Sequence, residues 1–149
     1  MLMKEEGKLA QKLIRRYHTN DPFEICESLG YIVLMVPLKG VRGFYQHKMR
    51  NHIIYVDQNL PEIIQRWVCA HELGHALMHD ATNAIYLDAH TYQVVGKYEL
   101  SADRFAAMLL WPDDHELLEY ADLSLEQLSN LMGISEDLVK WRYEQIPME

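Results

Sequence analysis

The segment His71-Glu72-Leu73-Gly74-His75 carries the residue types of a metal-dependent hydrolase. Two histidines four residues apart lie on one face of a helix, so both imidazoles can bind the same zinc ion. The glutamate between them can accept a proton from an attacking water molecule, and we expect Gly74 to keep the groove beside the metal open. The alternative is a helix with two partly exposed histidines, because an HExxH arrangement arises by chance in roughly one chain in thirty of this composition.

A catalytic zinc site also needs a third protein ligand and an open position for water. Glu99 is the best candidate, because it begins a segment in which Glu99 and Asp103 lie four residues apart on one helix face. Asp103 is then placed to accept a hydrogen bond from a ligand histidine and to fix its orientation. The alternative is a solvated acidic pair on a surface helix.

Other residues near the motif leave alternatives open. His79 continues the four-residue spacing, but each step turns about 40° around the helix, so we expect it to point away from the metal. Near the helix end its positive charge is favourable, although a ligand role stays open. The candidates for stabilising an oxyanion, among which the sequence does not choose, are Tyr86, His90, Tyr92 and Tyr98.

The elements that must position these residues predict an α+β fold, mostly helical with a small sheet. Apolar spacing and capping residues predict helices over 4–17, 22–29, 61–79 and 98–110, with a loop over 80–96. Strands are expected over 31–36, 43–46 and 52–56, with a polar hairpin loop between the last two. A small antiparallel sheet of about three strands therefore precedes the motif helix, and two or three short helices follow Pro112.

Composition restricts the classes of protein further. The 149 residues suggest one domain over 1–149, and no apolar run is long enough for a membrane span. The charged N-terminal residues do not fit a secretory signal. With only Cys26 and Cys69, a disulfide framework is not expected, which favours buried thiols in a reducing cytoplasm.

The net charge of −8 is concentrated near the C-terminus. Residues 113–149 form an acidic helical subregion with 10 acidic residues and only Lys140 and Arg142 as bases. Its segment 124–143 has the spacing of a helix-turn-helix, but Glu136 and Asp137 begin the helix that would meet DNA. Phosphates repel such a surface, so we expect no direct nucleic-acid partner and interpret the segment as two packed helices.

Two segments together resemble the ImmA/IrrE family of metallopeptidases, a gluzincin-type branch. The first is AHELGHALMH at 70–79. The second is ELSADRFAAMLLWP at 99–112, which is similar to the family pattern E-x-x-A-(N/D)-x-F-A-x-x-L-L-M-P. The order of elements also fits, and the resemblance covers residues 8–145.

The resemblance implies a zincin-like fold with one Zn²⁺ per chain. Carried over residue by residue, it makes His71, His75 and Glu99 zinc ligands and Glu72 the general base. Asp103 would orient a ligand histidine, although many relatives have asparagine there. Members of this family are often encoded by phages and mobile elements, where they cleave a helix-turn-helix repressor; others act in stress responses or as toxin partners.

These expectations give three functional hypotheses. The first is a zinc-dependent endopeptidase that hydrolyses a specific cytoplasmic protein, such as a phage or mobile-element repressor. The second is a zinc-containing anti-repressor that captures its partner without cleaving it. The third, disfavoured by the acidic surface, is a DNA-binding regulator that uses the C-terminal helices.

Overall fold

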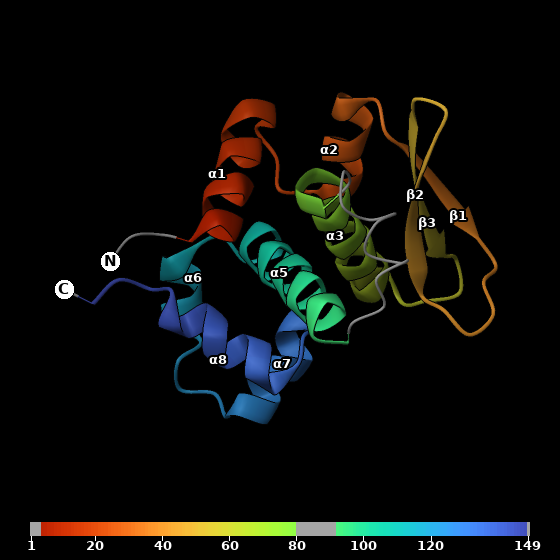
Figure 1. Ribbon diagram of the computed structural model, residues 1–149. Coiled ribbons are helices and arrows are strands. Elements are labelled where there is room, and N and C mark those ends of the chain that lie inside the picture. The colour runs from red at the N-terminus through yellow and green to blue at the C-terminus, as the bar shows by residue number, and fades with distance from the viewer. Residues whose placement is uncertain (1–3, 80–91, 149) are drawn as a thin grey trace.

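The computed structural model describes residues 4–79 and 92–148, with three strands and seven helices in these ranges (Figure 1). The helices are α1 (Glu5–Tyr17), α2 (Pro22–Leu29), α3 (Glu62–His79), α5 (Tyr92–Leu110), α6 (Asp114–Glu119), α7 (Leu125–Met132) and α8 (Glu136–Glu144). The strands are β1 (Ile32–Val36), β2 (Gly43–Lys48) and β3 (Asn51–Asp57). The predicted α+β class, mostly helical with a small sheet before the motif helix, is confirmed.

Local capping chemistry explains where several helices begin. The Asp21 carboxylate accepts a hydrogen bond from the Phe23 amide at 3.0 Å, and Pro22 supplies the preset first helical position of α2. Ser124 and Gln127 form a capping box at the start of α7. Ser135 caps α8 by accepting from the Leu138 amide at 3.2 Å. The predicted start of the helix at residue 22 is confirmed.

The sheet differs from the expected antiparallel arrangement in one pair of strands. Its order is β1-β3-β2, with β2 antiparallel to β3 and β1 parallel to β3. The chain crosses from β1 to the far edge, and β3 then inserts between the other two strands. The hairpin turn is also tighter than predicted, because Met49 and Arg50 take positive φ values of 59° and 113° without a glycine.

Helix α3 lies between the sheet and α5, which fixes the position of the motif (Figure 1). The inner face of the sheet buries Tyr45, Ile54 and Val56 in the same core as the apolar face of α3. On its other side α3 packs against α5, which starts at Tyr92 rather than at the predicted residue 98. Residues 92–96, which we predicted to lie in a loop, are therefore helical. The rest of the predicted loop, residues 80–91, lies outside the described residues.

Gly74 has a different role from the expected one. A Cβ at Gly74 would lie 2.9 Å from Cδ2 of Phe105 and 3.4 Å from Cα of Ala102, both on α5. The missing side chain therefore lets α3 and α5 approach closely and does not open a groove. This contact matters for the site, because α3 and α5 carry its two halves.

We expect Gly74→Ala to lower the free energy of unfolding by about 1–3 kcal/mol, because the added methyl group overpacks the helix interface. Urea unfolding followed by circular dichroism measures the change. Gly96→Ala, in a helical position with nothing within 4 Å of the added Cβ, is the matched control. That control should be neutral or stabilising, since alanine favours helix more than glycine does. Equal effects at the two positions would contradict the proposed role of Gly74.

Helix α8 packs against both α7 and α5. Leu128, Ile134, Leu138 and Val139 of this region are buried, whereas Leu131 is 40% exposed. Arg142 is fully buried and was not anticipated. Its guanidinium donates to Oδ1 of Asp114 at 2.7 Å and to the carbonyl oxygen of Trp111 at 2.8 Å, which ties α8 to the end of α5.

The two cysteines are buried, as expected, and both are free thiols whose sulfur atoms lie 4.0 Å apart. The hydrogen-bond contact with Cys26, together with burial, raises the pKa of the Cys69 thiol. None of the helices in the described ranges has the length and apolar character that crossing a bilayer demands.

Candidate metal centre

Three side chains from two helices converge on one point. Nε2 of His71 lies 3.0 Å from Oε2 of Glu99, and Nε2 of His75 lies 2.8 Å from Oε1 of the same carboxylate. One nitrogen or oxygen atom from each residue falls within 4.8 Å of the others. The residues expected to act as ligands are therefore together in space, although Glu99 is 24 residues beyond His75 and on another helix.

The chemistry of this donor set fits a divalent metal ion. The two imidazoles present the same ring nitrogen, and their rings stand at 81° to each other, as side chains do when they approach one point from two directions. Two neutral imidazoles and one carboxylate are a usual set of three protein ligands in catalytic metal sites. The two histidine side chains are 12% and 14% exposed, whereas that of Glu99 is 52% exposed, so the cluster is open on its α5 side.

Glu72 lies beside the cluster on α3. Its Oε2 is 3.9 Å from Nε2 of His71, and the side chain is only 13% exposed. Burial raises the pKa of this carboxyl, and the charges of His71 and His75 partly oppose that rise. A carboxylate that binds a proton more readily than usual is suited to general base and acid chemistry.

Asp103 contacts the other side of the His71 ring. Its Oδ1 lies 2.8 Å from Nδ1, a close ion-pair contact in which the ring N–H is not aimed straight at the oxygen. Burial alone would lower the pKa of His71, but the Asp103 and Glu99 carboxylates outweigh it and raise that pKa to about 10. Hydrogen bonds with the imidazoles of His71 and His75 hold the pKa of Glu99 well below its usual range.

The charge of His71 makes the stability of the metal-free protein depend on pH. Its folded-state pKa of about 10 exceeds the ordinary 6.5, so protonated His71 stabilises the fold fully below pH 6.5, and this stabilisation is lost as pH rises through about 10. We expect the Tm of chelator-treated protein, measured by circular dichroism, to fall between about pH 7 and 9. Asp103→Asn should flatten that fall, and identical profiles for the two proteins would contradict this assignment.

His79 differs from the expectation in its burial and its charge. It is buried at 6% exposure, its Nδ1 lies 3.2 Å from Nδ1 of His75, and its ring lies against Tyr98 at 4.4 Å between centroids. Burial, with a smaller contribution from His75, lowers the pKa of His79 to about 4. The expected favourable positive charge at the helix end is therefore wrong, because desolvation outweighs the helix dipole and leaves His79 neutral. It contacts His75 from the side away from Glu99.

The structure describes only some of the residues that could stabilise an oxyanion. The ring of Tyr98 lies against that of His79. Tyr86, His90 and the side chain of Tyr92 lie outside the described residues. Trp111 donates a hydrogen bond from Nε1 to the carbonyl oxygen of Met132 at 3.1 Å, which ties the end of α5 to α7.

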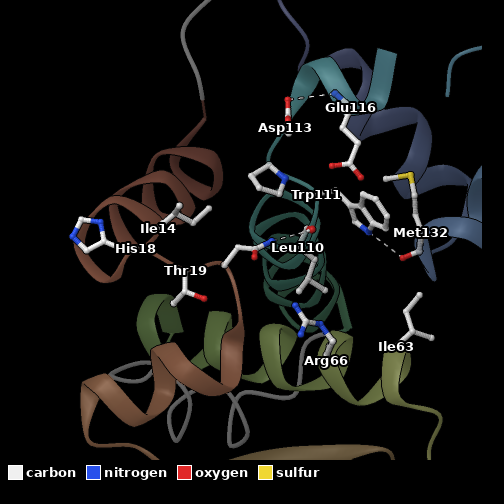
Figure 2. Close-up of a pocket in the computed structure, with 12 residues that line it drawn as sticks. Ile14, His18, Thr19, Ile63, Arg66, Leu110, Trp111, Asp113, Glu116 and Met132 are labelled. Carbon is white, nitrogen blue, oxygen red and sulfur yellow. Dashed lines mark hydrogen bonds between the residues drawn. The ribbon is translucent and has the colours of Figure 1, made fainter. Parts of the chain in front are cut away.

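A cavity of about 410 Å³ lies over the cluster, lined by His71, Glu72, Glu99 and Asp103 together with the start of β2. A larger cavity of about 580 Å³ lies elsewhere, between the end of α1, the start of α3 and Trp111 (Figure 2). None of the cluster residues lines it, and its walls are joined by hydrogen bonds such as that from Trp111 to Met132. Cavity size alone therefore does not locate the chemistry in this protein.

The helix pair, the histidine–glutamate cluster and the buried carboxyl beside it form the arrangement of a metal-dependent hydrolase. Comparison with known proteins agrees, because residues 26–144 match the peptidase M78 family, described as the IrrE N-terminal-like domain. The chain belongs to the ImmA/IrrE family of metallopeptidases. The resemblance predicted from the two sequence segments is thus confirmed.

Two relatives support the same conclusion. "Uncharacterized immunity region protein 2" of Bacillus phage phi105 is 33% identical over 131 residues, which cover 86% of this chain and 82% of the phage protein. "Metallopeptidase ImmA" of Bacillus subtilis strain 168 is 28% identical over 141 residues, which cover 91% of this chain and 82% of that protein. Membership of a metallopeptidase family implies a metal ion and a protein substrate.

Proposed function

We propose that this protein is a zinc-dependent endopeptidase of the HExxH type, with one zinc ion per chain. His71, His75 and Glu99 are the ligands, Glu72 is the general base, and Asp103 orients His71. The observation that carries the proposal is the convergence of the two imidazoles on Glu99, with Glu72 buried beside them. We treat residues 1–149 as one catalytic domain, with 113–149 as its acidic helical subregion.

The residues of the chain divide the chemical work between them. When bound, zinc polarises the scissile carbonyl group and lowers the pKa of water. Glu72 accepts a proton from the attacking water and donates it to the leaving amine, for which its raised pKa is favourable. Asp103 holds Nδ1 of His71, so that Nε2 faces the cluster.

The edge of the sheet can align an extended substrate. Among the described strands, β2 lies at one end of the order and pairs only with β3, and a strand in that place can add an extended segment through its main chain. At Gly43 this edge approaches α3 so closely that a Cβ would overlap the Val68 side chain. Val41, Arg42 and Gly43 line the cavity over the cluster, which brings the edge to the proposed reaction centre.

For the substrate we propose a cytoplasmic helix-turn-helix repressor of a phage or mobile element; the relative from phage phi105, which is named an immunity region protein, supports this choice. The test is to incubate zinc-loaded protein with purified candidate repressors from the same genome and to identify fragments by mass spectrometry. We expect one repressor to be cut at a single position, and chelation of the metal to stop the cut. A repressor that is bound and inactivated without any fragment would instead support the non-cleaving anti-repressor.

A further inference from the structure

The cavity over the cluster adjoins a second cavity at the C-terminal helices, with which it shares lining residues. This second cavity, of about 520 Å³, reaches the turn between α7 and α8. Arg42, Trp67 and Asp103 line both cavities. Because Asp103 also contacts His71, the second cavity begins directly beside the proposed metal ligands.

The second cavity is lined by a mixture of apolar and polar side chains. Ile134 and Leu138, each 6% exposed, come from the C-terminal helices, and Ile63, 43% exposed, comes from α3. The Ile63 side chain contacts the turn at Gly133, since a Cβ there would lie 3.0 Å from Cδ1 of Ile63. Ser129, Asn130 and Ser135 add polar atoms to the lining, and Ser129 donates a hydrogen bond to the carbonyl oxygen of Ile134. Such a mixture suits an apolar side chain attached to a hydrated main chain.

Arg42 stands where the two cavities meet. Its side chain is exposed and makes no ion pair with any residue in the described ranges. Its carbonyl oxygen accepts a hydrogen bond from the Asp57 amide at 2.8 Å, which fixes the backbone at the start of β2. The guanidinium is therefore available to donate to an oxygen atom of a molecule that passes from one cavity to the other.

We propose that the α7–α8 cavity is a specificity subsite for an apolar side chain of the substrate, with Arg42 donating to a main-chain carbonyl oxygen of the same segment. The inference rests on the proposed peptidase function. One side of the substrate is then recognised through its main chain along β2, and the other through a side chain of leucine or phenylalanine type. The C-terminal helices thereby take part in selecting the substrate.

The test uses capped tripeptide hydroxamates, whose metal-binding group anchors them at the site without need of a known substrate. One position at a time carries leucine, phenylalanine, serine or aspartate, and isothermal titration calorimetry with zinc-loaded protein measures Kd. At one position we expect leucine or phenylalanine to bind about 10-fold more tightly than serine, as burial of such a side chain predicts. Equal affinities at every position would overturn the subsite while leaving the metal site intact. Failure of all hydroxamates to bind would instead overturn the proposed zinc site.

Matched variants locate the subsite. Ile63→Ala should reduce the preference for leucine over serine, whereas Leu131→Ala, which removes a similarly exposed side chain outside the cavity, should not. Arg42→Gln should weaken binding of all the hydroxamates about 10-fold, as loss of a charge-assisted hydrogen bond predicts, and Lys39→Gln should have no effect. All four variants should retain stoichiometric zinc. A preference that survives Ile63→Ala unchanged would place the apolar side chain in another cavity and overturn the proposal.

Discussion

Replacing Glu72 with glutamine should leave the metal bound and lower the rate of substrate cleavage by at least about 100-fold, the usual contribution of a general base. The amide has the shape of the carboxylate but does not accept the proton. Glu72 is not among the three residues that converge as ligands, so metal content should stay at one ion per chain. Elemental analysis of the purified variant and cleavage assays on the same preparation measure both quantities.

The same variant separates the proposed peptidase from a non-cleaving anti-repressor. If Glu72→Gln relieves repression in cells as fully as the wild-type protein, catalysis is not the function and the peptidase proposal fails. Glu62→Gln, an exposed position in the first turn of α3, is the control for a glutamate-to-glutamine change on the same helix. It should retain full activity. The stability of Glu72→Gln should equal or exceed that of wild type, because the buried carboxyl is costly when charged.

The starts of helices can be predicted from the sequence because each capping contact joins residues only a few positions apart. Asp21 before Pro22 begins α2, and Ser124 with Gln127 begins α7, through contacts made inside the first turn. The motif helix was predicted for the same reason, since its apolar positions repeat at helical spacing. Glu99 was the best candidate for a third ligand because it lies four residues from Asp103 on one helix face, and the family resemblance of the second segment implied the same role.

Features that depend on distant neighbours could not be predicted in the same way. The parallel pairing of β1 with β3 results from the crossing of the chain, which no local residue specifies. From the sequence we expected Gly74 to keep a groove open, because the sequence does not show that Phe105 of α5 packs against it. From the sequence we expected His79 to be charged at the helix end, because the sequence does not show that its ring is buried. Arg142 looked like one of two surface bases in an acidic segment, whereas Asp114 and the Trp111 carbonyl bind it in the interior.

Replacing Glu99 with alanine should lower zinc affinity by more than about 100-fold, because a catalytic zinc site depends on all three protein ligands. The two imidazoles would then face solvent where they now contact one carboxylate. The fold should persist, since the Glu99 side chain is 52% exposed and lies outside the core. Competition with a zinc chelator of known affinity measures the loss, and circular dichroism checks the fold.

Two further variants provide zinc affinities with which that of Glu99→Ala can be compared. His71→Ala should lose stoichiometric zinc as Glu99→Ala does, whereas Asp103→Asn should lose only about 10–100-fold in affinity, since it acts through the orientation of His71. Glu119→Ala, an exposed change on α6, should bind zinc as the wild-type protein does. If Glu99→Ala binds zinc with wild-type affinity while His71→Ala does not, the third ligand is another residue, and the helix pair α3–α5 no longer explains the site. The graded order of these affinities therefore tests whether the carboxylate of α5 completes the site that the histidines of α3 begin.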